Sequence, residues 1–456
     1  MKRFLILAGC LSTLALTACS GDTALPEATG EANLRAINAI ESSPAISFLI
    51  EERIIGSVAY KESSRPASYD DLSYNFNFEV LFIDELALTR VATQPLDVVA
   101  NKDYTFIISG AVAAPAITVW ESDIREWGEA ETMTEFRFGH AAATQDPVDV
   151  YLAAPGIAPA DGNEIGTLAF GEVLPALEMP AGQYVVTITA ANDELDILFQ
   201  SNSFFTEAAS SLLINLFDGD ANDLGPLALI SFNTLSGGVA VLSDSRTQPT
   251  IRFLHASKDL GAVDIFIEDT LTMPLVSDHE FKDVTDDVPV PAGALPLAYT
   301  TANDTMMIHI QQSIGINPGV RWNYVVFGPA GTPGSAAHRV DRRSVETIAK
   351  FNFIQAASNH ESTDLYIVDR GADISPVVVF PAYVGLTVTG IPVTTPLNAG
   401  SFDLYLTTRG EKTVITGPFE LDIALGDIVD LISYDVDDTA FAEIVAIPPP
   451  TPAPPP

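Results

Sequence analysis

One sequence motif occurs four times along this chain, and a repeat of this kind strongly limits the possible folds. The copies read LRAINAIESSPAISFLI from Leu34, FRFGHAAATQDPVDVYL from Phe136, IRFLHASKDLGAVDIFI from Ile251 and FNFIQAASNHESTDLYI from Phe351. Successive copies begin roughly 100 to 115 residues apart, which is the size of a small domain. The chain is therefore expected to be an array of four related modules.

Each copy has the pattern of two β-strands joined by a polar loop. Apolar and polar residues alternate in Phe136–Phe138 and again in Val148–Val150, and a period of two is typical of a strand with one buried face. Turn-forming residues fill the loop between them. Further strand-like runs follow in each module, such as Val185–Ala190 and Leu212–Leu216. We therefore predict an all-β chain of four tandem β-sandwich modules.

The expected organisation follows from the motif starts and from composition changes at both ends. We expect a signal peptide (1–18), an acylated Cys with a flexible tether (19–32), β-sandwich repeats at 33–133, 134–249, 250–348 and 349–447, and a proline-rich tail (448–456). The tail reads PPPTPAPPP, which is more typical of a disordered end than of a recognition ligand.

The N-terminus has the parts of an export signal in order. Lys2 and Arg3 form a short basic region, and Phe4–Leu16 is apolar but broken by small and polar residues. A permanent membrane-spanning helix needs about 20 apolar residues, so this stretch is too short to be one. It is therefore interpreted as a signal peptide.

The end of the signal, Leu16 to Cys19 (LTAC), resembles the lipobox of bacterial lipoproteins. The resemblance implies that Cys19 is acylated and becomes the first residue of the mature chain, so that the membrane is a partner through the acyl chains. Ser20, which is not Asp, implies by the same resemblance sorting to the outer membrane of a Gram-negative bacterium. Cys10 lies within the signal, so the mature chain keeps one Cys, and neither an intramolecular disulfide nor a Cys-based metal site is expected.

The chain is strongly acidic. Removing the signal peptide removes Lys2 and Arg3 and no acidic residue, which leaves 20 basic and 60 acidic residues and a net charge of −40. Nucleic acid and anionic lipid are therefore not expected as partners, because binding to phosphate groups needs Lys and Arg. The main interpretation of the acidity is solubility or a salt-adapted host, and the alternative is divalent-cation binding.

Two columns of the aligned motifs contain residues that could carry chemistry. The first column contains Asn38, His140, His255 and Gln355, and the column nine residues later contains Ser47, Asp149, Asp264 and Asp364. A His beside a carboxylate could position a general base, whereas the structural alternative is a hydrogen bond that ties the loop to the next strand. Asn and Gln donate hydrogen bonds but do not transfer protons near neutral pH, so their presence favours the structural role. No GxSxG or HExxH motif accompanies the pairs, and no catalytic residue is predicted.

An acidic hairpin in the second module is the candidate metal site. Asp218, Asp220 and Asn222 place oxygen ligands at alternate positions, as in a calcium-binding loop. The pattern then departs, because Asp223 stands where a Gly is expected and Leu229 where a bidentate Glu is expected. A solvated loop is the simpler interpretation, and calcium is the only cofactor that the sequence suggests.

A His-Ala pair, followed later by Val-Asp and an aromatic residue, characterises the second and third copies, Phe136–Leu152 and Ile251–Ile267. This pattern resembles the domain of unknown function 4397 family. The resemblance implies tandem immunoglobulin-like β-sandwiches in secreted and surface proteins of bacteria, and no established activity. The first and fourth copies depart from the pattern, with Asn38 and Gln355 for His, Ser47 for Asp and Asn352 for Arg.

The leading hypothesis from the sequence is a non-enzymatic, outer-membrane-anchored lipoprotein whose modules act in binding or adhesion at the cell envelope. The modules would form a rod or bent array and bind through loops, with a glycan, a matrix component or an envelope protein as the target. The side of the membrane that they face is left open. The alternatives are a periplasm-facing structural or assembly lipoprotein, and a polysaccharide-active hydrolase with converging carboxylates of shifted pKa.

Overall fold

The computed structural model describes residues 27–83, 87–268 and 270–450. The expected signal peptide, the lipidation site Cys19, most of the tether and tail residues 451–456 lie outside the described residues. Within the described ranges the chain is almost entirely β, with one short 3-10 helix, η1 (Lys258–Leu260). The all-β class predicted from the motif is confirmed. No helix in this part of the chain is long and apolar enough to cross a membrane.

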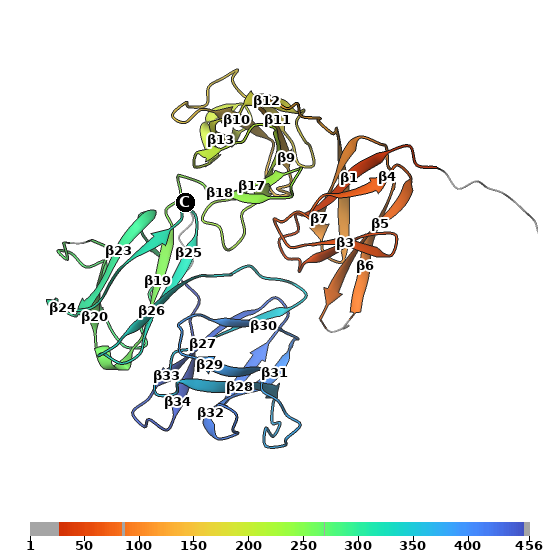
Figure 1. Ribbon diagram of the computed structural model, residues 1–456. Coiled ribbons are helices and arrows are strands. Elements are labelled where there is room, and N and C mark those ends of the chain that lie inside the picture. The colour runs from red at the N-terminus through yellow and green to blue at the C-terminus, as the bar shows by residue number, and fades with distance from the viewer. Residues whose placement is uncertain (1–26, 84–86, 269, 451–456) are drawn as a thin grey trace, which may run out of the picture.

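The strands group into four successive sandwiches, which follow one another from red to blue in Figure 1. The first contains β1 (Glu31–Asn38), β2 (Ile46–Ile50), β3 (Arg53–Val58), β4 (Ala67–Asp70), β5 (Ser73–Phe82), β6 (Ala87–Asp97), β7 (Lys102–Ala111) and β8 (Ala114–Asp123). The second contains β9 (Met133–His140), β10 (Val148–Ala153), β11 (Gly166–Leu168), β12 (Leu177–Pro180), β13 (Gln183–Ala190), β14 (Asp193–Gln200), β15 (Phe204–Phe205), β16 (Ser210–Asp218), β17 (Leu227–Asn233) and β18 (Val239–Leu242).

The second half of the chain repeats this organisation. The third sandwich contains β19 (Thr250–Ala256), β20 (Val263–Phe266), β21 (Val276–His279), β22 (Val288–Pro289), β23 (Gly293–Thr301), β24 (Asp304–Ile316), β25 (Arg321–Phe327) and β26 (Gly334–Arg339). The fourth contains β27 (Ala349–Gln355), β28 (Ser362–Asp369), β29 (Tyr383–Thr387), β30 (Val393–Leu397), β31 (Gly400–Thr408), β32 (Val414–Ile423), β33 (Ile428–Asp435) and β34 (Ala442–Ala446).

Every sandwich uses one strand order. The sheets of the first run β4-β1-β7-β8 and β3-β2-β5-β6, and the third and fourth repeat this order with their own eight strands. The second keeps it and adds a strand to each sheet, as β12-β9-β16-β17-β18 and as β11-β10-β13-β14 with β15 paired to β13. The first motif strand is parallel to the strand beside it from the end of the module, as β1 is to β7 and β19 to β25. Immunoglobulin constant domains also pack two sheets but divide seven strands as ABED and CFG, so the likeness lies in the sandwich architecture.

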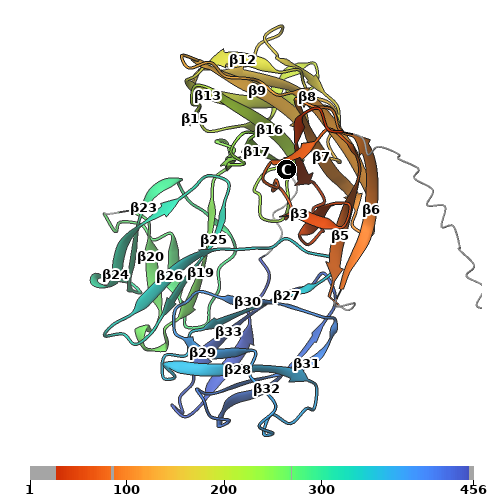
Figure 2. The ribbon, with the colours of Figure 1, turned by 45° about the vertical axis from the view of Figure 1, so that its right-hand side comes forward.

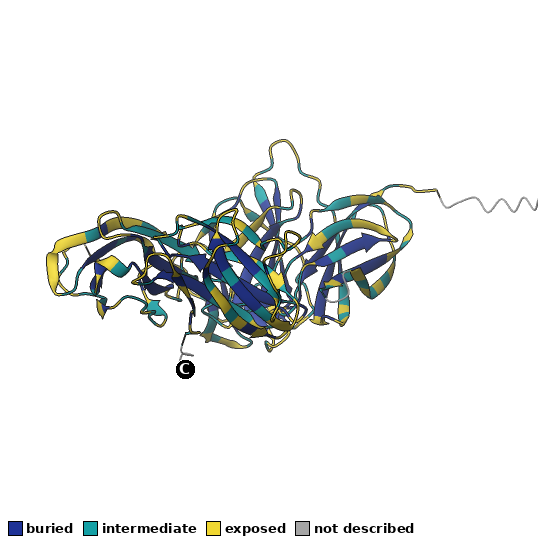
Figure 3. Cartoon of the chain, turned by 90° about the horizontal axis from the view of Figure 1, so that it is seen from below, coloured by how far each residue is buried: buried dark blue, intermediate teal, exposed yellow. Residues whose placement is uncertain are grey.

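Each sandwich has its own apolar core between its two sheets. In the first, Phe48, Phe76 and Phe106 are fully buried and their rings lie 4.6 to 5.8 Å apart. Figure 3 shows the buried residues concentrated in the strands, with exposed residues at hairpins and loops. Because Cys contributes no cross-link to the described residues, these cores and the contacts between sandwiches hold the fold together.

The sheet that contains the first motif strand (β1, β9, β19 or β27), here called the motif sheet, is also covered on its outer face. All seven residues of β19 are buried, so this strand has no exposed face, in contrast to the alternation predicted for Phe136–Phe138, where Arg137 is only partly buried. The reason is that the outer face packs against the motif sheet of the neighbouring sandwich. The first and second sandwiches meet through Ile37, Ile107, Trp120, Leu213, Phe217 and Ile230. The third and fourth meet through Leu254, Val325, Ile354, Ile432 and Tyr434.

The two pairs of sandwiches lie around a common centre, as Figures 1 and 2 show. The linker between the third and fourth sandwiches reaches the first, where Nη1 of Arg343 donates to the carbonyls of Glu41 and Ser43 at 2.5 and 2.8 Å. The backbone N–H of Glu346 donates to Ser42 in the same loop. The modules therefore close on one another and do not form the rod or bent array expected from tandem repeats, because polar linker groups bind the first sandwich.

Gly139 allows the first pair of motif sheets to approach closely, and substituting it tests the interface. A Cβ atom at this position would lie 2.3 Å from Cη2 of Trp120 and 2.4 Å from Oδ1 of Asn215. We expect Gly139→Ala to lower the free energy of unfolding by about 1–3 kcal/mol in denaturant titrations, because overpacking forces its neighbours to shift. Gly315→Ala is the matched control, since a Cβ there meets nothing within 4 Å. Equal losses in the two variants would contradict this role.

Arg343→Ala should loosen the closure of the four modules, because it removes both hydrogen bonds from this side chain to the first sandwich. We expect a larger radius of gyration in small-angle scattering and faster amide exchange at residues 41–43. Arg370→Ala is the control, because its ion pairs with Asp403, Glu420 and Asp422 stay within the fourth sandwich. An unchanged radius for Arg343→Ala would mean that the linker does not hold the modules together.

Candidate functional site

Three of the four residues in the first motif column close the loop after the first motif strand by hydrogen bonds. The side chains lie buried at the strand end and donate to carbonyls of the loop: Nδ2 of Asn38 to Pro44 at 3.4 Å, Nε2 of His255 to Gly261 at 2.8 Å, and Nε2 of Gln355 to His360 at 3.1 Å. Nδ1 of His255 accepts from the N–H of Ser257, so the ring is a neutral imidazole, and burial lowers its pKa. His140 is buried in the same position and burial lowers its pKa as well, but neither of its ring nitrogens makes a hydrogen bond of normal geometry to another described residue.

The second motif column holds the other sheet of the sandwich. Asp264 accepts from the N–H groups of Asp278 and Asn303 at 2.9 and 2.8 Å, and Asp364 accepts from Gly385 and Gly410 at 2.7 and 2.8 Å. Asp149 accepts from the N–H of Asn192 and from the hydroxyl of Thr167. Each carboxylate thus ties a hairpin turn to the second motif strand. Among the described residues no hydrogen bond joins His140 to Asp149 or His255 to Asp264, so the His–carboxylate pairs do not form.

The acidic hairpin of the second sandwich lies where several modules meet. The carboxylate of Asp218 accepts from the N–H groups of Ala143 and Thr144, which closes the motif loop. Asp220 forms an ion pair with Lys61 of the first sandwich at 3.3 Å, and Asp223 also binds this ammonium group. These carboxylates therefore already have protein donors.

Asn222 connects the same hairpin to the linker after the third sandwich. Its Nδ2 donates to Asp341 at 3.0 Å, and its Oδ1 accepts from the N–H of Arg342 at 2.5 Å. No group of three or more His, Cys, Asp or Glu among the described residues is placed to hold a metal ion. Calcium binding by Asp218, Asp220 and Asn222 stays a prediction, and the structure gives these residues a role in joining modules.

A cavity of about 490 Å³ lies between the first and second sandwiches, and we call it the first-pair cavity. Strands β7 and β8, the linker after them, and strands β9 and β16 contribute to its walls. Trp120 and Leu213 supply apolar surface from the two sides of the interface. The charged residues of the lining are Asp103, Glu121, Asp123, Arg125, Glu135 and Arg137.

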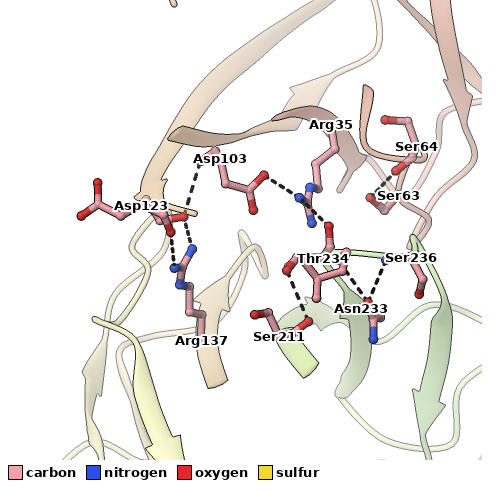
Figure 4. Close-up of polar contacts among 12 residues, drawn as sticks. Arg35, Ser63, Ser64, Asp103, Asp123, Arg137, Ser211, Asn233, Thr234 and Ser236 are labelled. Atoms are coloured by element: carbon pink, nitrogen blue, oxygen red, sulfur yellow. Dashed lines mark hydrogen bonds and ion pairs between the residues drawn. The ribbon is translucent and has the colours of Figure 1, made fainter. Parts of the chain in front are cut away.

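A buried ion pair stands behind one wall of this cavity. Arg35 is 1% exposed, and its Nη2 donates to Asp103 at 2.5 Å and to the carbonyl of Thr234 in the second sandwich at 3.0 Å (Figure 4). Burial lowers the pKa of Arg35 and raises the pKa of Asp103, since both charges have left water. The short contact between them offsets this cost, and the hydrogen bond from Arg35 to Thr234 links the two sandwiches.

Arg137 forms a second bridge across the same junction. Its guanidinium donates to the hydroxyl of Ser122 and to the carbonyl of Asp123, both in the first sandwich (Figure 4). It also pairs with Glu135 of its own strand at 3.1 Å. The two guanidinium groups thus fix the relative position of the walls, and the cavity is built into a rigid interface.

The second pair of sandwiches has an equivalent junction that is nearly filled. Arg252 takes the place of Arg35 and donates to the carbonyl of Pro448, just after the last strand of the fourth sandwich, at 2.8 Å. Asn352 stands in place of Arg137 and donates to Asp430 at 2.7 Å. The space left there is about 110 Å³, and we call it the second-pair groove.

Sequence reasoning did not single out the cavity residues. The signal that could have found them is the second position of the motif, which is Arg35, Arg137 and Arg252 in the first three copies and Asn352 in the fourth. A charged residue that recurs on a partly buried strand needs a partner of opposite charge or a hydrogen-bond acceptor. Asp103 lies 68 residues from Arg35 in the sequence, so spacing could not connect them.

Removing one member of the buried pair should be costly. We expect Asp103→Ala to lower the free energy of unfolding by about 3–5 kcal/mol in denaturant titrations, because it leaves the Arg35 charge buried without a counter-charge. Lys102→Ala is the control in the same strand, since its ion pairs with Glu121 and Asp123 are solvent-exposed and such pairs contribute about 0–1 kcal/mol. Similar decreases in the free energy of unfolding of the two variants would show that the buried ion pair contributes no more to stability than the exposed ones.

Solved structures resemble the chain only distantly. The TIE protein of Bacillus anthracis is 9% identical, with 86% of this chain and 68% of that protein covered at a TM-score of 0.16. The major pilin subunit BcpA of Bacillus cereus is 10% identical, with 67% of this chain and 99% of the pilin covered at a TM-score of 0.14. Scores this low carry no argument. No curated protein matches the chain significantly.

The family model described as "Domain of unknown function (DUF4397)" matches residues 32–151 and 249–366. Each match starts at the first sandwich of a pair and extends through the first two strands of the next, so the two matches include all four motif copies almost completely. Together they cover more than half of the chain. The resemblance expected from the motif is confirmed, and the chain belongs to the DUF4397 family.

Proposed function

We propose that this chain is a lipid-anchored protein of the bacterial outer membrane that binds a ligand at the cell envelope without catalysis, and that the ligand enters the first-pair cavity. The observation that carries the proposal is the cavity itself. Its volume of about 490 Å³ falls within the range of about 300–1,000 Å³ that is usual for small-molecule sites. Its lining combines apolar surface with a few charged groups, which is the composition expected of such sites.

The walls of the cavity favour binding because they are fixed before a ligand arrives. They belong to strands that are packed on one another through the apolar contact of Trp120 with the second sandwich. The ring nitrogen of Trp120 donates to the carbonyl of Gly171 at 2.8 Å, which fixes the indole. A preorganised site loses less conformational entropy when it binds, so more of the interaction energy appears as affinity.

A hydrolase is the second candidate, and one observation favours it. Burial raises the pKa of Asp103, as a general acid requires. However, Asp103 is hydrogen-bonded to Arg35 and Glu135 is paired with Arg137, and guanidinium groups favour the ionised form of a carboxylate. Binding is therefore ranked first. Release of reducing ends from envelope polysaccharide by the purified chain would reverse this ranking.

The anchor and its orientation need a test of their own. We expect wild-type protein to fractionate with outer membranes and Cys19→Ser protein to be released, because the acyl chains hold the chain to the membrane. Protease treatment of intact and permeabilised host cells then separates an outward-facing binder from the periplasm-facing structural or assembly protein. A Cys19→Ser variant that stays in the membrane fraction would exclude the lipid anchor.

Filling the cavity tests the proposed site directly. Ala176 lines the cavity and is exposed, so Ala176→Trp should occupy the space without disturbing a core. We expect this variant to lose saturable binding to isolated host envelopes, measured with labelled full-length mature chain. Ala158→Trp is the control, because Ala158 is an exposed loop residue of the same sandwich that does not line the cavity. Envelope binding that survives Ala176→Trp would exclude the first-pair cavity.

A further inference from the structure

The junction in the first pair of sandwiches can be compared with the equivalent junction in the second pair. The comparison shows which features follow from the packing of two motif sheets alone. Arg35 and Arg252 occupy equivalent positions, and each donates to a backbone carbonyl near the end of the partner sandwich, Thr234 and Pro448 respectively. The two junctions share their strand order and their apolar contact. Yet the second-pair groove measures about 110 Å³ and the first-pair cavity about 490 Å³. The larger space is therefore not a necessary result of pairing two sandwiches.

The charges around the first-pair cavity are already paired with one another. Asp103 binds Arg35 at 2.5 Å, Glu135 binds Arg137 at 3.1 Å, and Arg125 binds Glu131 at 3.0 Å. Glu121 and Asp123 share the ammonium group of Lys102 at 3.0 and 2.8 Å. An anionic ligand would therefore find no unpaired guanidinium or ammonium group among the described residues of this lining and would lose its hydration without compensation, and a cationic ligand would compete with the Arg and Lys partners of these carboxylates.

A neutral ligand with many hydroxyl groups suits this lining. A hydroxyl can donate to a carboxylate and accept from an N–H of a guanidinium at the same time, so it can bind an ion pair without breaking it. Carboxylates keep free lone pairs after binding one guanidinium. Trp120, which is 7% exposed, adds a small apolar surface for the C–H groups of such a ligand.

We propose that the first-pair cavity binds a neutral carbohydrate, such as the end of an uncharged envelope glycan. This inference rests on the proposed function and names the ligand class for the same site. The acidity of the whole chain supports it, because a net charge of −38 repels anionic polysaccharide. The second-pair groove, which is far smaller, is not assigned a sugar.

The test uses the full-length mature chain and an array of neutral, uronic-acid and amino-sugar oligosaccharides, followed by calorimetry with the best binder. We expect neutral glycans to be selected, with an affinity that changes little when salt is raised, because screening acts on charge–charge attraction. Ala176→Trp should weaken binding by more than about tenfold, which corresponds to about 1.4 kcal/mol. Ala158→Trp should leave the affinity unchanged, and equal melting temperatures confirm that both variants fold.

A second variant keeps the inference open to refutation if Ala176→Trp fails to fold. Arg125→Gln removes a lining guanidinium that forms ion pairs with Glu131 and Glu178, and it should also weaken neutral-glycan binding. Selection of acidic or basic glycans, or neutral-glycan binding that survives both variants, would overturn the inference. If envelope binding is lost in Ala176→Trp while no glycan binds, the ligand is a peptide or another class, so the inference fails and the proposed function stands. If Ala176→Trp leaves envelope binding unchanged, both fail.

Discussion

The burial of the outer face of each motif sheet is the constraint on which the rest of this structure depends. A sandwich with one core would leave this face in water, but here it is apolar and packs against a second motif sheet. Two apolar interfaces result. One packs Trp120 against the second sandwich, and the other packs Leu254 against the fourth. Burying this additional apolar area stabilises the pairs, so the folding unit is larger than a single module.

The charged residues buried in these interfaces determine where space is left between the paired sandwiches. Arg35 cannot be buried without Asp103, and the pair brings the end of β17 to the first sandwich through Thr234. Arg137 bridges in the opposite direction to Asp123. Two guanidinium groups with their partners lie beside Trp120 in the first pair, whereas the second pair has Asn352 in place of Arg137 and a smaller space. The same repeat thus yields a cavity in one half and a nearly closed junction in the other.

Polar contacts at the centre of the molecule join the two pairs of sandwiches. The acidic hairpin that resembles a calcium loop uses Asp220 and Asp223 to bind Lys61 and uses Asn222 to bind the linker after the third sandwich. Its oxygen-rich composition is explained by neighbours that are far away in the sequence. From its sequence alone, a loop of this composition is expected to be solvated or to bind a metal ion. The sequence pattern does not show which groups of another module contact the loop.

The sequence by itself determined the repeat, the all-β class and the family, because these depend on the local alternation of apolar residues and on motif residues close together in the chain. It also favoured a hydrogen-bonding role for the column of Asn38, His140, His255 and Gln355, since only that chemistry is common to Asn, His and Gln, and in the structure all but His140 make such a bond. Only the tertiary structure decided the strand order, the pairing of sandwiches, the closure through Arg343 and the cavity beside Asp103. These depend on contacts between residues that are tens to hundreds of positions apart, such as Arg343 with Ser43, and the free energy of such contacts comes from surfaces that meet only after each module has folded.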